Sequence, residues 1–234
     1  MGKRHGSIGQ HKRQSGTNQV KRMKKIMFND KYCLTQAVLA GEKTMTRRVE
    51  KPTEMADGYT MEDVVTIFHE YSSLLNAHSF SLCDNEKKIG VLNPRYQVGE
   101  IVAIAQSYND IYNELEGQGN DVSNEWWINA SDIIGKGLDT LAGYKNKMFV
   151  RADFMIHHVK ITDVKVERLQ DITEEDALKE GICEFAFSYY LPNGYGKSFN
   201  RPREAFAYLI DMVSGKGIWD FNPWVVTYSS ELVD

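Results

Sequence analysis

The residues with the clearest chemical potential lie between Gly41 and Val49, in the order Gly-Glu-Lys-Thr-Met-Thr-Arg-Arg-Val. If the chain is extended after the glycine turn, alternate side chains share a face, which groups Thr44, Thr46 and Arg48. Lys43, at the entrance to the strand, could favour ionisation of the Thr46 hydroxyl or stabilise a developing oxyanion. These residue types suit acyl transfer. The alternative is an ordinary edge strand with solvated cations.

A candidate acid, Glu180, lies far along the chain from this segment. The sequence from Thr173 predicts a helix, because Thr173 is a good N-cap and three acidic residues follow it in the first turn. We expect this helix to end near Gly181, which places Glu180 in its last turn. There the negative end of the helix dipole makes the carboxylate a better base, whereas a nearby Lys43 acts in the opposite direction. A solvated carboxylate at a helix end is the alternative.

Three aromatic residues, Tyr108, Trp126 and Trp127, could bind a nucleobase by stacking. They belong to a glycine-containing stretch that predicts loops. Stacking of one base on an aromatic ring contributes about 1 to 3 kcal/mol. The alternative is that a tryptophan anchors a long loop.

The sequence contains no pattern typical of a metal or cofactor site. His157 and His158 are neighbours on an expected strand, so their side chains face opposite ways and do not ligate one metal ion. The three cysteines, at positions 33, 83 and 183, suit neither a disulfide framework nor a zinc site. A glycine-rich phosphate-binding motif is absent as well. We therefore predict no metal, no cofactor and a reducing, cytoplasmic location.

Composition and charge narrow the class of protein. The 234 residues are 42% hydrophobic, and no apolar run approaches the roughly 18 residues that cross a membrane. The first 28 residues contain eight Lys or Arg and no acid, so the remainder, with 20 basic and 32 acidic residues, has a net charge of −12. A body this acidic repels a long phosphate backbone more than it repels a small or flipped-out nucleoside. We predict no membrane partner.

The chain length and the pattern of expected elements predict a single domain over residues 26–234 that positions the candidate residues. The composition of residues 1–25 predicts a disordered basic leader. Two insertions are expected, at about 51–94 and 107–146, and the first includes a helix from Met61 to Leu75. Strands and helices do not alternate regularly, which favours an α+β fold over a doubly wound sheet. The expected core elements are an apolar segment at 25–28, a helix at 34–39, strands at 44–49 and 101–105, one or two strands within 148–169, a helix from Pro202 to Val213 that stops at Gly215, and a strand at 224–228.

Three segments, Leu39–Arg48, Tyr96–Val102 and Leu169–Gly181, resemble the ASCH domain family. The resemblance covers residues around 27–50, 94–106 and 147–231, and leaves the leader and both insertions outside it. It implies a PUA-like fold, which is a small mixed β-barrel with flanking helices.

The same resemblance implies a function associated with RNA. Small bacterial members of the family include amidohydrolases that remove the acetyl group from N(4)-acetylcytidine with a Lys, a Thr and a Glu. The family's G-x-K-T-x-T-x-R segment places the lysine on Lys43, the threonine on Thr46 and the arginine on Arg48, and the acid after the helix start falls on Glu180. We therefore expect Lys43, Thr46 and Glu180 to be catalytic. The residues expected to bind substrate are Arg48, Arg47, Thr44, Tyr108, Trp126 and Trp127.

Two other functions remain open from the sequence, and so does the oligomeric state. The first is a non-catalytic module that binds single-stranded RNA, with Lys43, Arg47, Arg48 and the leader on phosphates and an aromatic residue on a base. The second is an endoribonuclease in which His157 or His158 moves protons.

Overall fold

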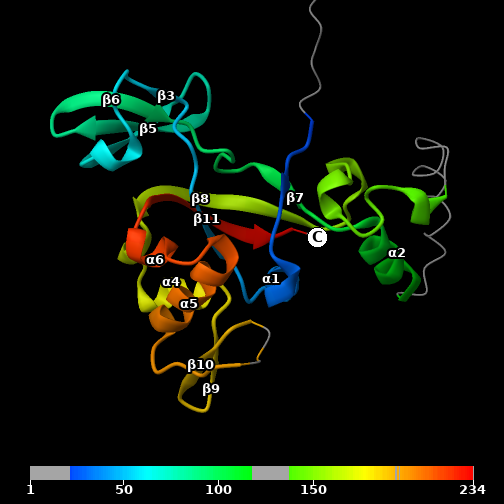
Figure 1. Ribbon diagram of the computed structural model, residues 1–234. Coiled ribbons are helices and arrows are strands. Elements are labelled where there is room, and N and C mark those ends of the chain that lie inside the picture. Colours follow the sequence, from blue (N-terminus) through cyan, green and yellow to red (C-terminus); the bar gives the residue numbers. More distant parts are fainter. Residues whose placement is uncertain (1–21, 118–136, 193, 195, 234) are drawn as a thin grey trace, which may run out of the picture.

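A computed structural model describes residues 22–117, 137–192, 194 and 196–233 (Figure 1). The predicted α+β class is confirmed, because helices and strands are mixed around a central sheet. Within the described ranges, no helix is long and apolar enough to span a bilayer. Most of the expected leader, together with Trp126 and Trp127, lies outside the described residues.

The central sheet has five strands in the order β1-β7-β8-β11-β2. The long strands β8 (His158–Arg168) and β11 (Trp224–Leu232) form an antiparallel pair at the centre of this sheet, which runs through the middle of Figure 1. The strand β2 (Met45–Arg48) pairs with β11 at one edge, so that Thr46 lies opposite Tyr228. At the other edge, β1 (Lys25–Ile26) runs parallel to β7 (Ile101–Ile104). The candidate motif therefore lies on an edge strand.

The closed barrel that we expected is not formed by the described residues, which make three open sheets. The strand β1 is two residues long, and the chain then turns away into a 3₁₀ helix at Asp30–Tyr32. No main-chain ladder joins β1 to β2 in this part of the chain. Side chains connect the two edges instead: Arg48 Nη2 donates to the carbonyl of Met27 at 2.6 Å. The strands of the central sheet were predicted from the sequence. The shortness of β1, which leaves the sheet open, was not predicted.

The helices α4 (Glu174–Lys179), α5 (Pro202–Ser214) and α6 (Ile218–Phe221) group together on one side of the central sheet (Figure 1). The helix α1 (Leu34–Leu39) lies nearby and has the predicted bounds. The predicted caps are also confirmed, because the Thr173 hydroxyl accepts a hydrogen bond from the Asp176 N–H at 3.0 Å. At the end of α5, Gly215 has a φ of 117°, which disfavours any other residue.

The first expected insertion forms its own four-stranded sheet, at the upper left of Figure 1, in the order β3-β6-β5-β4. The helix predicted from Met61 to Leu75 is wrong, because only Met61–Asp63 is helical, as a 3₁₀ turn. The β-branched run that follows, Val-Val-Thr-Ile at 64–67, instead leads into β4 and a hairpin. The strands are β3 (Glu54–Met55), β4 (Thr66–Ser72), β5 (Ala77–Asp84) and β6 (Lys87–Leu92).

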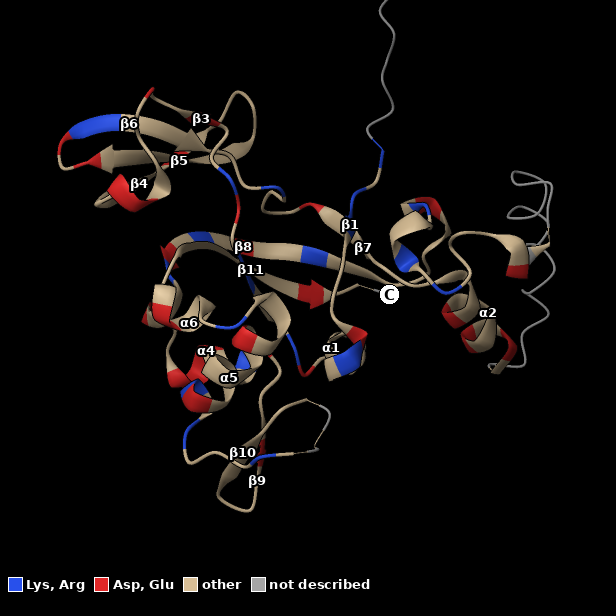
Figure 2. Cartoon of the chain, in the orientation of Figure 1, with Lys and Arg blue, Asp and Glu red and all other residues tan. Residues whose placement is uncertain are grey.

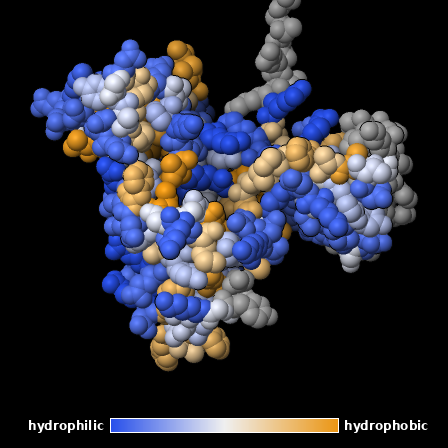
Figure 3. Space-filling view, viewed as in Figure 1, coloured by the Kyte–Doolittle hydropathy of each residue, from blue (hydrophilic) through white to orange (hydrophobic). Residues whose placement is uncertain are grey.

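The second expected insertion begins with the helix α2 (Tyr108–Gly117). The strand predicted within 148–169 starts only at His158, because short 3₁₀ helices at Lys147–Phe149 and Ala152–Phe154 precede it. A small hairpin, β9 (Cys183–Phe185) with β10 (Ser188–Tyr190), was not predicted. Hydrophobic side chains are exposed at its tip, the lowest part of Figure 3.

Replacement of the α4 cap tests the local stability of the helix that carries Glu180. We expect Thr173→Ala to lower the free energy of unfolding by about 1 kcal/mol, because the Asp176 N–H loses its acceptor. Thr173→Ser keeps a hydroxyl and should lose much less. Urea denaturation of both variants gives the comparison, and equal losses would contradict the capping role.

Candidate functional site

A cavity of about 470 Å³ lies between the two open edges of the central sheet and α5. The segment after β1 contributes Phe28 and the edge strand β2 contributes Thr46. One wall is apolar and comes from residues of α5 at helical spacing. Those residues are Phe206, Leu209, Ile210 and Val213. The polar residues that line it include Lys43, Thr46, Arg47, Arg48 and Glu180.

Lys43 and Glu180, predicted to act together, are in direct contact. The ammonium of Lys43 donates to Glu180 Oε2 at 2.5 Å, to the Glu180 carbonyl at 2.9 Å and to the Met45 carbonyl at 2.7 Å. Both side chains are almost fully buried, at 3% and 5% exposed. The backbone fixes this approach, since the Thr44 N–H donates to the carbonyl of Lys179 at the end of α4.

The end of α4 also favours a glycine. Gly181 has a φ of 97°, and a Cβ there would lie 3.4 Å from Lys43 Cβ. That distance is an ordinary van der Waals contact, so it is the left-handed turn, rather than the packing of the two segments, that favours glycine here.

Burial has the largest effect on the pKa of Lys43 and lowers it. The carboxylate of Glu180 raises this pKa, and the charges of Arg48 and Arg47 lower it again, so that the net pKa lies below the ordinary value for lysine. The amine is therefore easier to deprotonate than a solvated lysine. That is the property required of a lysine that accepts or relays a proton.

Arg47, expected to bind substrate, has a different environment. Its side chain has no exposed surface, and its guanidinium donates to Glu167 Oε1 at 2.8 and 3.0 Å, to Asp176 Oδ2 at 3.0 Å and to Glu180 Oε1 at 3.1 Å. Arg47 lines the cavity, but these donors are engaged by carboxylates of the protein, so a substrate contact through Arg47 stays a prediction. The alternating pattern could not distinguish a solvated arginine from one buried among carboxylates.

The charges of this network balance when the partly exposed Lys165 is counted. Lys43, Arg47 and Lys165 pair with three carboxylates within 3.2 Å. The carboxylates belong to Glu167, Asp176 and Glu180, and acidic residues of α4 appear red in Figure 2. Sequence reasoning missed Glu167 and Lys165 and treated Asp176 only as a helix-start acid. The apolar residues of α5 repeat at i, i+4 spacing, a pattern in the sequence that could have predicted the apolar wall of the cavity. No local pattern identified Glu167.

Arg48 is the cation of the pocket that these carboxylates do not neutralise. Its guanidinium lies 5.7 Å from the centre of the Phe28 ring, and Nη2 donates to the Met27 carbonyl. Its Nε is buried and, among the described residues, has no hydrogen-bond partner. The guanidinium of Arg48 therefore brings a positive charge to the lining of the pocket, with one N–H that no described group accepts.

Thr46 lines the same pocket and is 8% exposed. Its hydroxyl makes no hydrogen bond with any residue that the structure describes. The hydroxyl is consequently free to meet a ligand, but Lys43 is not bonded to it in this conformation.

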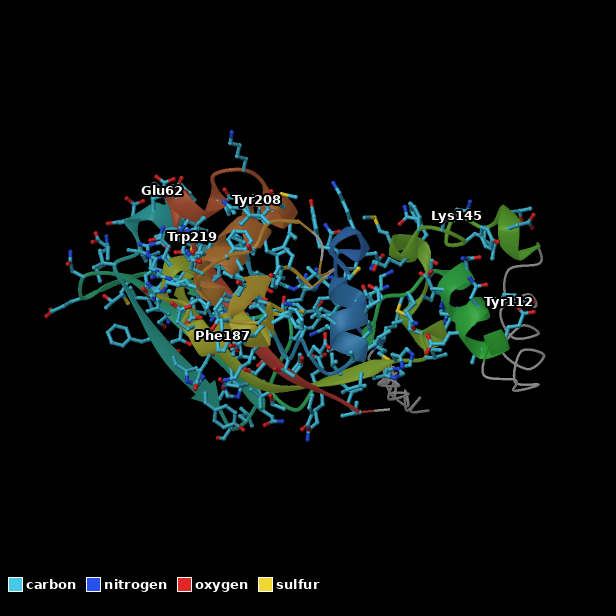
Figure 4. The ribbon with its side chains drawn as sticks, turned by 90° about the horizontal axis from the view of Figure 1, so that it is seen from below. Glu62, Tyr112, Lys145, Phe187, Tyr208 and Trp219 are labelled. Carbon is cyan, nitrogen blue, oxygen red and sulfur yellow. The ribbon has the colours of Figure 1, made fainter. Side chains whose placement is uncertain are left out.

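Two other predicted residues that the structure describes, Thr44 and Tyr108, do not line this pocket, and Trp126 and Trp127 lie outside the described residues. Thr44 acts through its main chain, which accepts from the Ser230 N–H. Tyr108 is 4% exposed and packs against Phe154 in a second core, so no base can stack on it. Figure 4 shows α2, with Tyr112, at the end of the molecule opposite Tyr208 of α5.

Comparison of the chain with models of protein families, with curated proteins and with solved structures found no match. Among the residues that the structure describes, no group of three or more His, Cys, Asp or Glu side chains could hold a metal ion. The site must therefore be interpreted from its own geometry.

Removal of the Arg47 guanidinium should destabilise the protein strongly. Arg47→Met removes one buried cation from three carboxylates, and we expect a loss of about 3 to 5 kcal/mol in the free energy of unfolding. Lys165→Met is the matched control: Lys165 pairs with Glu167 and Asp176, but its side chain is 41% exposed, so the loss should be about 1 kcal/mol or less. Chemical denaturation measures both, and similar losses would contradict the central role of Arg47.

Asp176 should make stability depend on acid pH. Burial alone would raise the pKa of Asp176, but the hydrogen bonds and charges of Lys165 and Arg47 bring it below 3.8. A lowered folded-state pKa contributes stability that is present above pH 3.8 and is lost as the pH falls through the folded pKa. We expect the stability difference between wild type and Asp176→Asn to be constant near pH 6 and to shrink as the pH falls from about 4 to about 3. A difference that stays constant in urea titrations over this range would refute the pairing.

Proposed function

We propose that the protein is an amidohydrolase that removes an acyl group from a modified nucleoside such as N(4)-acetylcytidine. The observation that carries the proposal is the 2.5 Å contact between Lys43 Nζ and Glu180 Oε2 in the pocket that Thr46 also lines. These are the three residues on which the resemblance to the ASCH family, with its PUA-like fold, places catalysis. The reducing cytoplasm is the proposed location, in keeping with three free cysteines.

Thr46 is the proposed nucleophile. Transfer of a proton within the buried pair gives a neutral Lys43 amine and a protonated Glu180, and the lowered pKa of Lys43 favours this step. The amine then takes the proton of the Thr46 hydroxyl while the oxygen attacks the amide carbonyl carbon. The positive charge of Arg48, which lines the cavity, stabilises the oxyanion that forms.

The intermediate then breaks down in two steps. The C–N bond breaks as Glu180 gives its proton to the departing amine, which leaves as cytidine, and the acyl group stays on Thr46 as an ester. Glu180, again a carboxylate, takes a proton from water, and the water oxygen attacks the ester. The bond between the acyl carbon and the Thr46 oxygen breaks, Lys43 returns its extra proton to that oxygen, and acetic acid leaves. Glu180 then passes the proton it took from water to Lys43, which restores the ion pair.

The cavity supports a ligand of nucleoside size. Its volume of about 470 Å³ falls within the range of small-molecule sites. The apolar α5 wall suits the flat face of a base, and the polar wall suits the amide.

The two rival functions have less support. Phosphate binding would need Lys43 and Arg47, but both have their donors engaged by the protein and are buried. An endoribonuclease would need His157 or His158, and His157 is instead in contact with Glu114 at 2.5 Å, outside the pocket.

The proposal is tested by incubating the protein with N(4)-acetylcytidine and detecting cytidine by mass spectrometry. We expect Lys43→Met, Thr46→Val and Glu180→Gln each to lower kcat by about a thousandfold or more, because the three act as one unit. Thr44→Val is the matched control and should keep activity, since Thr44 does not line the pocket.

Salt separates turnover from phosphate binding in the same assay. Turnover of a neutral nucleoside should change little with salt, whereas binding to RNA phosphates weakens steeply. The proposal fails if folded wild type releases no cytidine, or if Thr46→Val retains full activity.

A further inference from the structure

The carboxylate of Glu180 is held at both of its oxygens. Lys43 Nζ donates to Oε2, and Arg47 Nη1 donates to Oε1 at 3.1 Å. A carboxylate with one partner can rotate about its side-chain bonds, whereas one with a cation on each oxygen has a fixed plane. Arg47 therefore determines how Glu180 faces the pocket.

Arg47 is in turn fixed by groups that do not line the pocket. Glu167 Oε1 accepts from both Nε and Nη2 of Arg47, and it also accepts from the Thr227 hydroxyl at 3.0 Å. Thr227 lies directly opposite Arg47 in the β11–β2 ladder. Glu167 of β8 and Thr227 of β11 thus hold the guanidinium of Arg47, which extends from β2, in place against the central sheet.

The chain of contacts runs from the sheet to the candidate acid. It passes from Thr227 to Glu167, then to Arg47, then to Glu180. Arg47 and Glu180 have 0% and 5% exposed side chains, so water competes little for these contacts. In the segment that resembles the ASCH motif, Arg47 occupies a position that the motif leaves open.

We propose that Arg47 is a positioning residue, held by Glu167, that orients Glu180 for its two proton transfers. This inference rests on the proposed function. Glu180 must first serve the departing amine and then a water molecule, and both steps need a fixed oxygen. Misplacement by about 1 Å can cost about a hundredfold in rate.

Glu167→Gln and Arg47→Lys test the inference. Glu167→Gln removes a charge outside the pocket but leaves every pocket residue in place. Arg47→Lys keeps the charge but cannot contact Glu167, Asp176 and Glu180 together. With N(4)-acetylcytidine we expect both variants to lose about 10- to 100-fold in kcat, with KM changed by less than about threefold. Lys165→Met, which shares Glu167 and Asp176 but not Glu180, is the control and should keep kcat.

A second readout does not depend on turnover. Carbon-13 NMR of the Glu180 side-chain carboxyl, assigned with Glu180→Gln, should show a resonance that moves in Glu167→Gln and Arg47→Lys but not in Lys165→Met. If the wild type lacks amidase activity and this change occurs, the proposed function fails and the positioning role stands. If folded Glu167→Gln and Arg47→Lys keep the wild-type resonance, or keep kcat while only the melting temperature falls, Arg47 is structural and the inference is overturned.

Discussion

The buried network around Arg47 is the interaction on which the rest of the site depends. Removing an ion from water costs several kcal/mol even after relaxation, so each buried charge must keep its partner. Lys43 and Arg47 come from the β2 segment, Glu167 from β8, and Asp176 and Glu180 from α4 and its end. A shift of any one element would leave a charge unpaired. The network therefore fixes the distance between the sheet and the helix that bring Lys43 and Glu180 together.

The open sheet gives this network a cavity. In a closed barrel, a strand would cover the free edge of β2 with main-chain hydrogen bonds. Here β1 is too short, and Met27 and Phe28 reach that edge through a carbonyl group and a ring. Polar side chains of β2 can then face a cavity on one side while α5 closes it with apolar residues. An exposed edge strand can promote aggregation by pairing with another chain. The edge strand β2 lies beside α5 and carries the charged side chains of Arg47 and Arg48.

Local signals predicted much of the scaffold. The Thr173 cap, the helix at Leu34–Leu39 and the helix that begins at Pro202 follow from capping and periodicity, which depend on neighbours in sequence. The predicted helix at 61–75 failed because β-branched residues and cross-strand partners outweighed a weak helical period. The open sheet was not predictable, since closure depends on the length of an edge strand rather than on any motif.

The same contrast holds in the site. Lys43, Thr46 and Glu180 were predicted from residue type and resemblance, and the fold brings them to one pocket. The role of Arg47 was missed because its partners Glu167 and Glu180 are 120 and 133 residues away in sequence. No pattern in a single chain reports such pairs, because a strand arginine has the same spacing whether it meets water or carboxylates.

Charge balance finally constrains what the pocket can accept. Three cations and three carboxylates neutralise one another, which leaves Arg48 as the charge that a ligand meets first. A polyphosphate or a stretch of RNA backbone needs several free cations, because each phosphate contact releases counterions only where a positive charge replaces them. A neutral amide needs only one positive group near the oxygen on which charge develops during attack, and the cavity lining includes Arg48. Because the cations of the network are already paired with carboxylates, the pocket is better suited to a neutral acyl compound than to a phosphate ligand.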